Sequence, residues 1–279
     1  MHHWNWMLVV EMFLGGMAGA CFFVGALADF FSKGKYRRLA KIGSFCVLPL
    51  VAVTMIFLLL DLPLTRVIYF WHFMIIKPLS SMNMGVWILI PFTVVAGVLI
   101  PAIFLAEDKG ILPFLKGKEG LRKVLSVIGI ILGVGVMGYS GVILADKAVS
   151  LWGTSIFLPA TWVAVSVVSG IALIRLILSL SSEKDEEAEG ALSKALTMAL
   201  IIAAIAILIF AFSSGDAGAI LISGSYALAF WLGVVAIGIV APIVVGFAAK
   251  NMGAVSSVLA LLGVFLWKYI ALYGGIPLH

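Results

Sequence analysis

Cysteine and histidine are both scarce in this sequence of 279 residues, and their scarcity excludes most protein-borne redox centres. The chain has only two cysteines, Cys21 and Cys46, which are too few to hold an iron–sulfur cluster. The histidines all lie at or near the ends of the apolar segments described below: His2, His3, His72 and His279. None is placed to ligate a b-type haem in mid-membrane. We therefore expect no metal site, no haem and no iron–sulfur cluster in this protein.

Charged residues are scarce as well. They make up 11% of the chain, against about 25% in a typical soluble domain, while hydrophobic residues make up 63%. Eight apolar runs are each long enough, at about 20 residues, to cross the hydrocarbon core of a bilayer as a helix. They lie at approximately 5–31, 38–60, 84–106, 122–145, 155–180, 194–213, 225–248 and 254–274. The sequence therefore predicts an all-α integral membrane protein with eight transmembrane helices.

Short polar intervals separate these runs. The longest of them divides the predicted domain into two parts. The longest interval, 181–193, contains the acidic run Glu183–Glu189, which we expect to be a solvated cytoplasmic linker. It separates four helices, within about 5–146, from four more, within about 155–274. We therefore expect a single membrane domain over residues 1–279, built as two four-helix bundles. The aromatic-rich connection 61–87 is expected to lie in the membrane interface.

The positions of lysine and arginine predict the orientation of the helices. Four of the 18 basic residues fall on one side of the membrane, namely Arg66, Lys77, Lys147 and Lys268, and the other 14 fall on the opposite side. Because cytoplasmic loops carry the excess of basic residues, both termini are predicted to lie outside the cytoplasm. The net charge of +5 is therefore a topology signal, and we expect no nucleic-acid partner.

Glu11 is an isolated acidic residue in the first apolar run. It follows Asn5 by six residues, which places it about 9 Å below the outer end of a helix. A carboxyl group at that depth is costly, so a functional role is the default hypothesis. Gly15 and Gly19 follow at spacings of four and eight and share its helix face, where a neighbouring helix can approach closely. A simple hydrogen bond to that neighbour is the alternative.

Two other polar residues are predicted at the depth of Glu11. Tyr139 lies seven residues before Asp146, about 10 Å below the outer end of a glycine-rich helix. Lys268 lies about six residues before the end of the last helix, near Gly274. Packing against a neighbour would also explain Tyr139, and a side chain that extends to the interface would also explain Lys268. Chemistry near the outer face is the simpler interpretation of the shared depth.

Several segments together resemble the NrfD-like family, the membrane subunits of polysulfide reductase and related respiratory molybdoenzymes. The similarity spans nearly the whole sequence in the same order. The segments that carry it are Trp6 with 14–19, then 77–89, 138–144, 151–152, 158–159, 230–242 and 262–269.

This resemblance implies a haem-free anchor in the inner membrane of a prokaryotic cell that binds a quinone of the menaquinone or ubiquinone type near the outer face. It also implies an iron–sulfur subunit docked at that face, which exchanges electrons with a molybdopterin catalytic subunit. Such an anchor would be a subunit of an enzyme, with no complete reaction of its own. On the family pattern, Glu11 and Tyr139 contact the quinone head group. Asp61, His72 and Lys268 complete the predicted cofactor-binding set.

The chemistry of quinones fits these residue types. Reduction of a quinone takes up two electrons and two protons, so the site needs an acid or base and a hydrogen-bond donor. Glu11 has the first role in this hypothesis, and Tyr139 donates a hydrogen bond to a quinone oxygen. Asp61 or Lys268 would tune the charge or carry protons to the outer surface.

The sequence departs from the family pattern in places and leaves other functions open. The family can have a histidine at the position of Glu11 and an asparagine at the position of Leu8, and Lys268 replaces an arginine. A lone histidine such as His72 is more often a solvated interfacial residue than a ligand. A transporter or proton-conducting subunit is the alternative function, because several prolines permit broken helices. A structural anchor whose quinone site has decayed is a third.

Overall fold

The computed structural model describes residues 6–61, 75, 80–146, 150–183, 185–248 and 252–275, and all regular secondary structure in these ranges is helical. Eight helices there are long and apolar enough to cross a membrane, as predicted. The spans are α1 (Trp6–Phe31), α2 (Arg37–Asp61), the composite α5 (Ser81–Phe92), η1 (Thr93–Leu99) and α6 (Ile100–Lys109), α7 (Glu119–Ala145), α9 (Leu158–Leu180), α10 (Glu186–Ser213), the composite η3 (Ala229–Val240) and α12 (Ala241–Ala248), and α13 (Gly253–Gly274).

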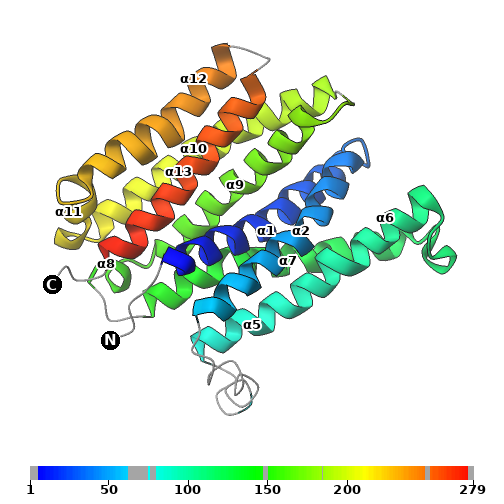
Figure 1. The fold of residues 1–279 in the computed structure, drawn as a ribbon, viewed down its shortest axis with the longest axis horizontal. Helices are drawn as coiled ribbons and strands as arrows, with labels where there is room; N and C mark the ends of the chain where they lie inside the picture. Colours follow the sequence, from blue (N-terminus) through cyan, green and yellow to red (C-terminus); the bar gives the residue numbers. More distant parts are fainter. Residues whose placement is uncertain are drawn as a thin grey trace.

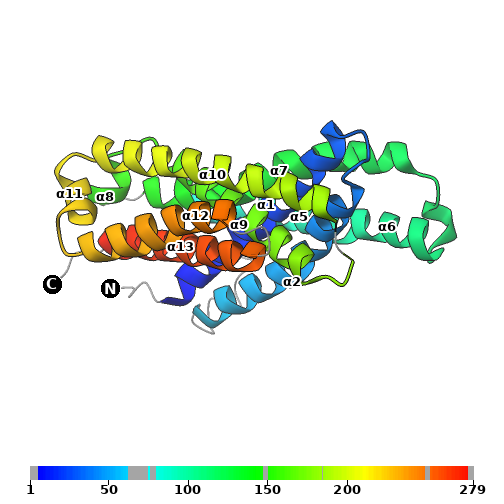
Figure 2. The same ribbon diagram turned by 90° about the horizontal axis from the view of Figure 1, so that it is seen from above.

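The spans lie side by side, with α1 near the centre (Figure 1). α1 packs against α2, α7 and α9 and also contacts α13. We call the end where α1 begins and α13 ends the terminal end of the array. The other end holds the α1–α2 turn (31–37) and the α6–α7 connection (109–119), and we call it the basic end. Figure 2 shows α11 (Asp216–Ile222) at one extremity of the molecule and the α6–α7 connection at the other.

Small residues allow α1 to approach two neighbours closely. A Cβ built on Gly19 would lie 2.8 Å from the carbonyl oxygen of Gly133 in α7. A Cβ built on Gly170 of α9 would lie 2.6 Å from the Cβ of Ala20. Side chains cannot tolerate such distances, so these glycines determine how near α7 and α9 lie to α1. The close packing predicted for the glycine-rich first and fourth spans is present.

The third and seventh spans share a π-helical segment. The sequence predicted only that the prolines in these spans permit a kink. Each contains a π-helical segment, η1 or η3, that ends just before a proline, Pro101 or Pro242. A glycine stands four residues before each proline, at Gly97 and Gly238. Proline lacks an N–H and its ring crowds the carbonyl of the residue four positions earlier, and the wider π turn relieves that crowding.

The acidic run corrects one predicted boundary. The sequence predicts a linker at Glu183–Glu189 and a sixth span from about 194, but α10 begins at Glu186. The Asp185 carboxylate accepts a hydrogen bond from the backbone N–H of Ala188 at 3.0 Å and so caps the helix. Acidic residues in the first turn also favour the positive end of the helix dipole. Most of the predicted interfacial connection 61–87 lies outside the described residues, namely 62–74 and 76–79.

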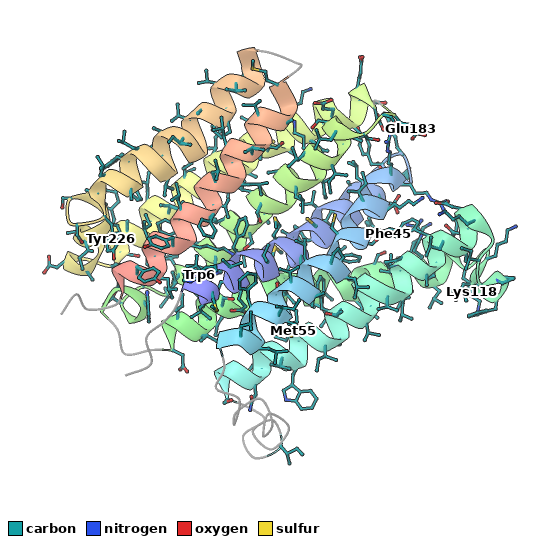
Figure 3. All side chains as sticks on the ribbon, viewed as in Figure 1. Trp6, Phe45, Met55, Lys118, Glu183 and Tyr226 are labelled. Atoms are coloured by element: carbon teal, nitrogen blue, oxygen red, sulfur yellow. The ribbon has the colours of Figure 1, made fainter. Side chains whose placement is uncertain are left out.

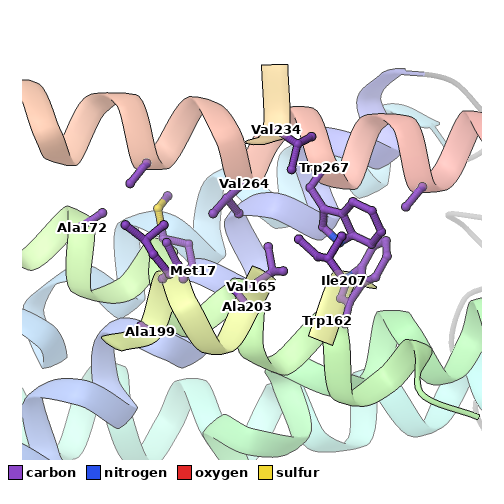
Figure 4. Close-up of a cluster of buried hydrophobic side chains, with 14 of the residues drawn as sticks. Met17, Trp162, Val165, Ala172, Ala199, Ala203, Ile207, Val234, Val264 and Trp267 are labelled. Atoms are coloured by element: carbon purple, nitrogen blue, oxygen red, sulfur yellow. The ribbon is translucent and has the colours of Figure 1, made fainter. Parts of the chain in front are cut away.

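Buried side chains form two hydrophobic clusters. One joins α9, α10, η3 and α13 to α1, and the other joins α2, the third span and α7 to α1. Figure 4 shows part of the first cluster, where Trp162 and Trp267 lie beside Val165 and Val264. Outward-facing side chains cover the helices in Figure 3, where Lys118 and Glu183 lie at the basic end and Tyr226 at the terminal end. Among the outward-facing residues, many are large and apolar, as lipid contact requires.

Candidate functional site

Glu11 and Tyr139 meet near the terminal end of the array. Glu11 projects from the second turn of α1 and is 4% exposed. Tyr139 comes from the last turns of α7 and is half-buried. Its phenolic oxygen donates a hydrogen bond to Oε1 of Glu11 at 2.5 Å. The close approach of α1 and α7 at Gly19 and Gly133 therefore brings together the two residues that the sequence placed at one depth.

The Tyr139 ring packs against the backbone of α5. A Cβ built on Gly85 would lie 2.6 Å from Cδ2 and 2.7 Å from Cε2 of Tyr139, so the ring rests against bare backbone. α5 itself begins with the Ser80 side chain, which accepts a hydrogen bond from the backbone N–H of Asn83. Gly85 therefore determines how far the phenol can move away from Glu11.

Lys268 is buried and does not extend to the surface. Its side chain comes from α13 and the residue is 1% exposed. Nζ donates hydrogen bonds to the carbonyl oxygen of Met12 at 2.8 Å and to Oγ of Ser166 at 3.1 Å. It also lies 5.5 Å from the centre of the Trp162 ring, which gives it a cation–π contact. Lys268 thus ties α13 and α9 to the turn of α1 that carries Glu11.

Gly16 provides the space for this arrangement. A Cβ at Gly16 would lie 2.6 Å from Nζ of Lys268 and 2.5 Å from Oγ of Ser166. Among the described residues no carboxylate forms an ion pair with Lys268, so its charge is stabilised by the Met12 carbonyl, the Ser166 hydroxyl and the Trp162 ring. A buried cation next to the Glu11 turn favours a negative charge at that end of α1.

The other two predicted site residues are placed only partly or not at all. Asp61 is the last residue of α2, and its side chain is outside the described part of the protein. His72 lies in the segment 62–74, outside the described residues. Their predicted roles therefore stay predictions.

Sequence reasoning missed Ser166 and Trp162, because it searched the fifth span for acids and bases only. A usable signal was present, since the two residues are four positions apart and share one helix face. Both are fully buried. Gly85 carried no signal of its own, because its role depends on a tyrosine more than 50 residues away.

A second buried polar group lies at the basic end of α1 and is separate from this site. Asp29 forms an ion pair with Arg122 of α7 at 2.6 Å. Asp29 follows Glu11 by 18 residues, so it lies about 27 Å away along α1. The two ends of the α1–α7 contact are therefore joined by different chemistry, a carboxyl–phenol pair and an ion pair.

Comparisons with known proteins identify the family to which this chain belongs. A family model described as "Polysulphide reductase, NrfD" matches residues 2–278. The chain belongs to the NrfD family. It is also similar to the C subunit of polysulfide reductase from Wolinella succinogenes, with 26% identity over 301 residues that span 98% of this protein and 94% of the relative. The family membership agrees with the eight apolar helices, so this NrfD protein is a multi-pass membrane protein.

Proposed function

We propose that this NrfD protein is the haem-free, quinone-binding membrane anchor of a multisubunit respiratory oxidoreductase. The observation that carries the proposal is the hydrogen bond from Tyr139 to Glu11 near the terminal end of the helix array. It joins a proton-exchanging group and a hydroxyl donor in an apolar setting. A quinone oxygen needs both partners when it gains or loses protons.

The two side chains fit the quinone chemistry in distinct ways. The Tyr139 hydroxyl can turn from Oε1 of Glu11 to donate to a quinone oxygen, because a hydroxyl rotates about its C–O bond. The Glu11 carboxyl group would take up the proton released by a quinol, or supply one to a quinone, at Oε1. Buried apolar helices around the pair would limit the access of water.

Lys268 would support this site from the opposite face of α1. It binds the carbonyl of Met12, the residue after Glu11, and places a positive charge beside that turn. In this proposal the charge favours the carboxylate form of Glu11 between proton transfers. Asp61 and His72 are proposed to complete the quinone site or its proton route on the outer side.

The proposed partners are an iron–sulfur subunit at the outer face and a molybdopterin catalytic subunit beyond it. The Wolinella succinogenes relative is by name one of several subunits of a reductase, which supports a multisubunit assembly. We place both termini outside the cytoplasm, in the inner membrane of a prokaryote, because 14 of 18 basic residues fall on the opposite side. The two hydrophobic clusters support an arrangement as two four-helix bundles.

Substitutions in the intact complex test the proposal. We expect Glu11→Gln to lower quinone-coupled turnover by about 100-fold or more, because a positioned acid or base contributes a factor of ~10²–10⁴. We expect Tyr139→Phe to lower it by about 10- to 100-fold, the value of a hydrogen bond to a charged group. The catalytic subunit should keep its activity with an artificial dye, which bypasses the anchor.

Two results would contradict the proposal. Unchanged quinone kinetics in both variants would remove Glu11 and Tyr139 from the mechanism. Ion-dependent uptake by the isolated protein in liposomes, with no binding of quinone analogues to the complex, would favour a transporter instead.

A further inference from the structure

The connection between α6 and α7, residues 110–118, exposes apolar side chains at the basic end. Ile111 is 51% exposed and Phe114 is 66% exposed, on either side of the short helix start at Pro113. Leu112 has a φ of 64°, a left-handed conformation that is strained for a bulky side chain. Left-handed Gly110 and Gly117 bound the same stretch. Strain of this kind is kept where a particular presentation of side chains is useful.

Lysines flank these apolar side chains in the sequence. Lys109, Lys116, Lys118 and Lys123 are all exposed, and none of them forms an ion pair with a described residue. Some other cations of this end are neutralised by carboxylates.

The neutralised cations of the basic end provide a contrast. Lys35 pairs with Glu187, and Lys41 pairs with Asp108 at 2.5 Å. The Glu187 carboxylate also raises the pKa of Lys35 above its usual value. The charge of the 110–118 turn is therefore left for a partner outside this protein.

The position of the turn indicates what that partner is. In Figure 1 the α6–α7 connection lies about level, along the helix axes, with the other turns at this end. It joins two of the candidate membrane spans, Asn83–Lys109 and Glu119–Ala145, so we expect it to lie where these helices leave the bilayer. The α1–α2 turn repeats the pattern, with exposed Phe31 beside Lys33, the other non-glycine residue with positive φ in the described ranges.

We propose that the 110–118 turn binds the anionic phospholipid surface of the membrane. Ile111 and Phe114 enter the boundary between headgroups and acyl chains, while Lys116 and Lys118 contact lipid phosphates. Apolar side chains flanked by unpaired lysines at the bilayer surface have the composition of a segment that lies in the interface. The Leu112 backbone turns these side chains toward the lipid. This inference is independent of the quinone proposal.

Depth measurement tests the apolar part. A spin label on Phe114→Cys would be compared in the full-length reconstituted protein with labels on Ile205→Cys, a 52% exposed mid-span position, and on Glu183→Cys in a loop. The labelled wild-type protein corrects for Cys21 and Cys46. We expect relaxation of the label at 114 by dissolved oxygen to exceed that by a water-soluble nickel complex. Relaxation like that at 183 would overturn the proposal.

Lipid retention tests the charged part. The probe is phosphatidylglycerol against phosphatidylcholine in mixed bilayers, with bound lipids counted by native mass spectrometry. We expect Lys116→Gln/Lys118→Gln to lower the preference for phosphatidylglycerol by about 30-fold, since each lysine near an anionic surface is worth a factor of about five. The matched control, Lys35→Gln/Lys41→Gln, removes the same charge from paired lysines of the same end. An equal loss in both double variants, or no preference in the wild type, would overturn the proposal.

Discussion

At the scale of single residues, Glu11 is accommodated because another segment supplies a hydrogen-bond donor. A buried carboxyl group without a partner costs several kcal/mol. This cost is about the same as that of placing an unpaired charge in the middle of a membrane. The Tyr139 hydroxyl satisfies one oxygen, and Lys268 of α13 provides a positive charge beside the next residue. The arrangement depends on glycines at Gly16 and Gly85, which leave room for the lysine and the phenol ring.

The position of the Tyr139 ring can be tested by a substitution that removes no polar atom. Gly85→Ala would place a methyl group 2.6 Å from the Tyr139 ring and push the phenol out of line with Glu11. If the pair binds quinone, we expect quinone-coupled kcat/KM to fall by about 10- to 100-fold, because a displacement of about 1 Å can cost 100-fold.

The control for this prediction is Gly120→Ala, a helical glycine of α7 with open space around its Cβ. Quinone kinetics measured on the intact complex should leave that control unchanged. Equal kinetics in Gly85→Ala and wild type would show that the ring position has no effect on turnover.

At the scale of elements, prolines and glycines act together in the third and seventh spans. Pro101 and Pro242 follow π-helical segments, and Gly238 of η3 packs directly against Gly263 of α13. The backbone-to-backbone contact holds α13 in place, and α13 carries Lys268. A composite span can therefore affect the site without contributing a polar side chain to it.

Gly238→Ala tests this contact. The added Cβ would meet the backbone of Gly263, which cannot rotate away as a side chain does. We expect the free energy of unfolding to fall by about 1–3 kcal/mol, the usual cost of overpacking. Reversible unfolding in mixed detergent micelles measures it.

Gly190→Ala in α10 is the matched substitution, because nothing lies within 4 Å of its Cβ. It should be neutral or stabilising by up to about 1 kcal/mol, since alanine favours a helix over glycine. A loss of stability as large as that of Gly238→Ala would indicate a general sensitivity to alanine rather than a helix contact.

At the scale of the whole molecule, α1 belongs to both hydrophobic clusters and holds the array together. Its terminal end contacts α7 through Tyr139 and α13 through Lys268, while its basic end is pinned by the Asp29–Arg122 ion pair. We expect the excess of lysine and arginine at the basic end to set the orientation in which this array inserts.

Reporter fusions test the orientation. We expect alkaline phosphatase fused after the last helix to be active, and the same enzyme fused after Lys116 to be inactive, because it folds only after export. Green fluorescent protein at the two positions should give the reverse pattern. An active phosphatase at 116 would reverse the topology and move the proposed quinone site to the cytoplasmic face.

The eight spans could be predicted from the sequence because an apolar run of sufficient length has few alternatives in a bilayer. The common depth of Glu11, Tyr139 and Lys268 also followed, since helix rise converts residue number into height. The start of α10 did not follow, because an acidic run indicates solvent exposure but also stabilises a helix N-terminus. Composition alone does not separate those two outcomes.

What the sequence by itself determined was height within the membrane and the candidate residue types. Only the tertiary structure decided which side chains meet, because rotation of each helix about its axis depends on contacts with its neighbours. Those contacts turned Tyr139 toward Glu11 and Lys268 toward Met12, and they brought Ser166 and Trp162 to the lysine. Such contacts join residues more than 100 positions apart, and no local pattern encodes them.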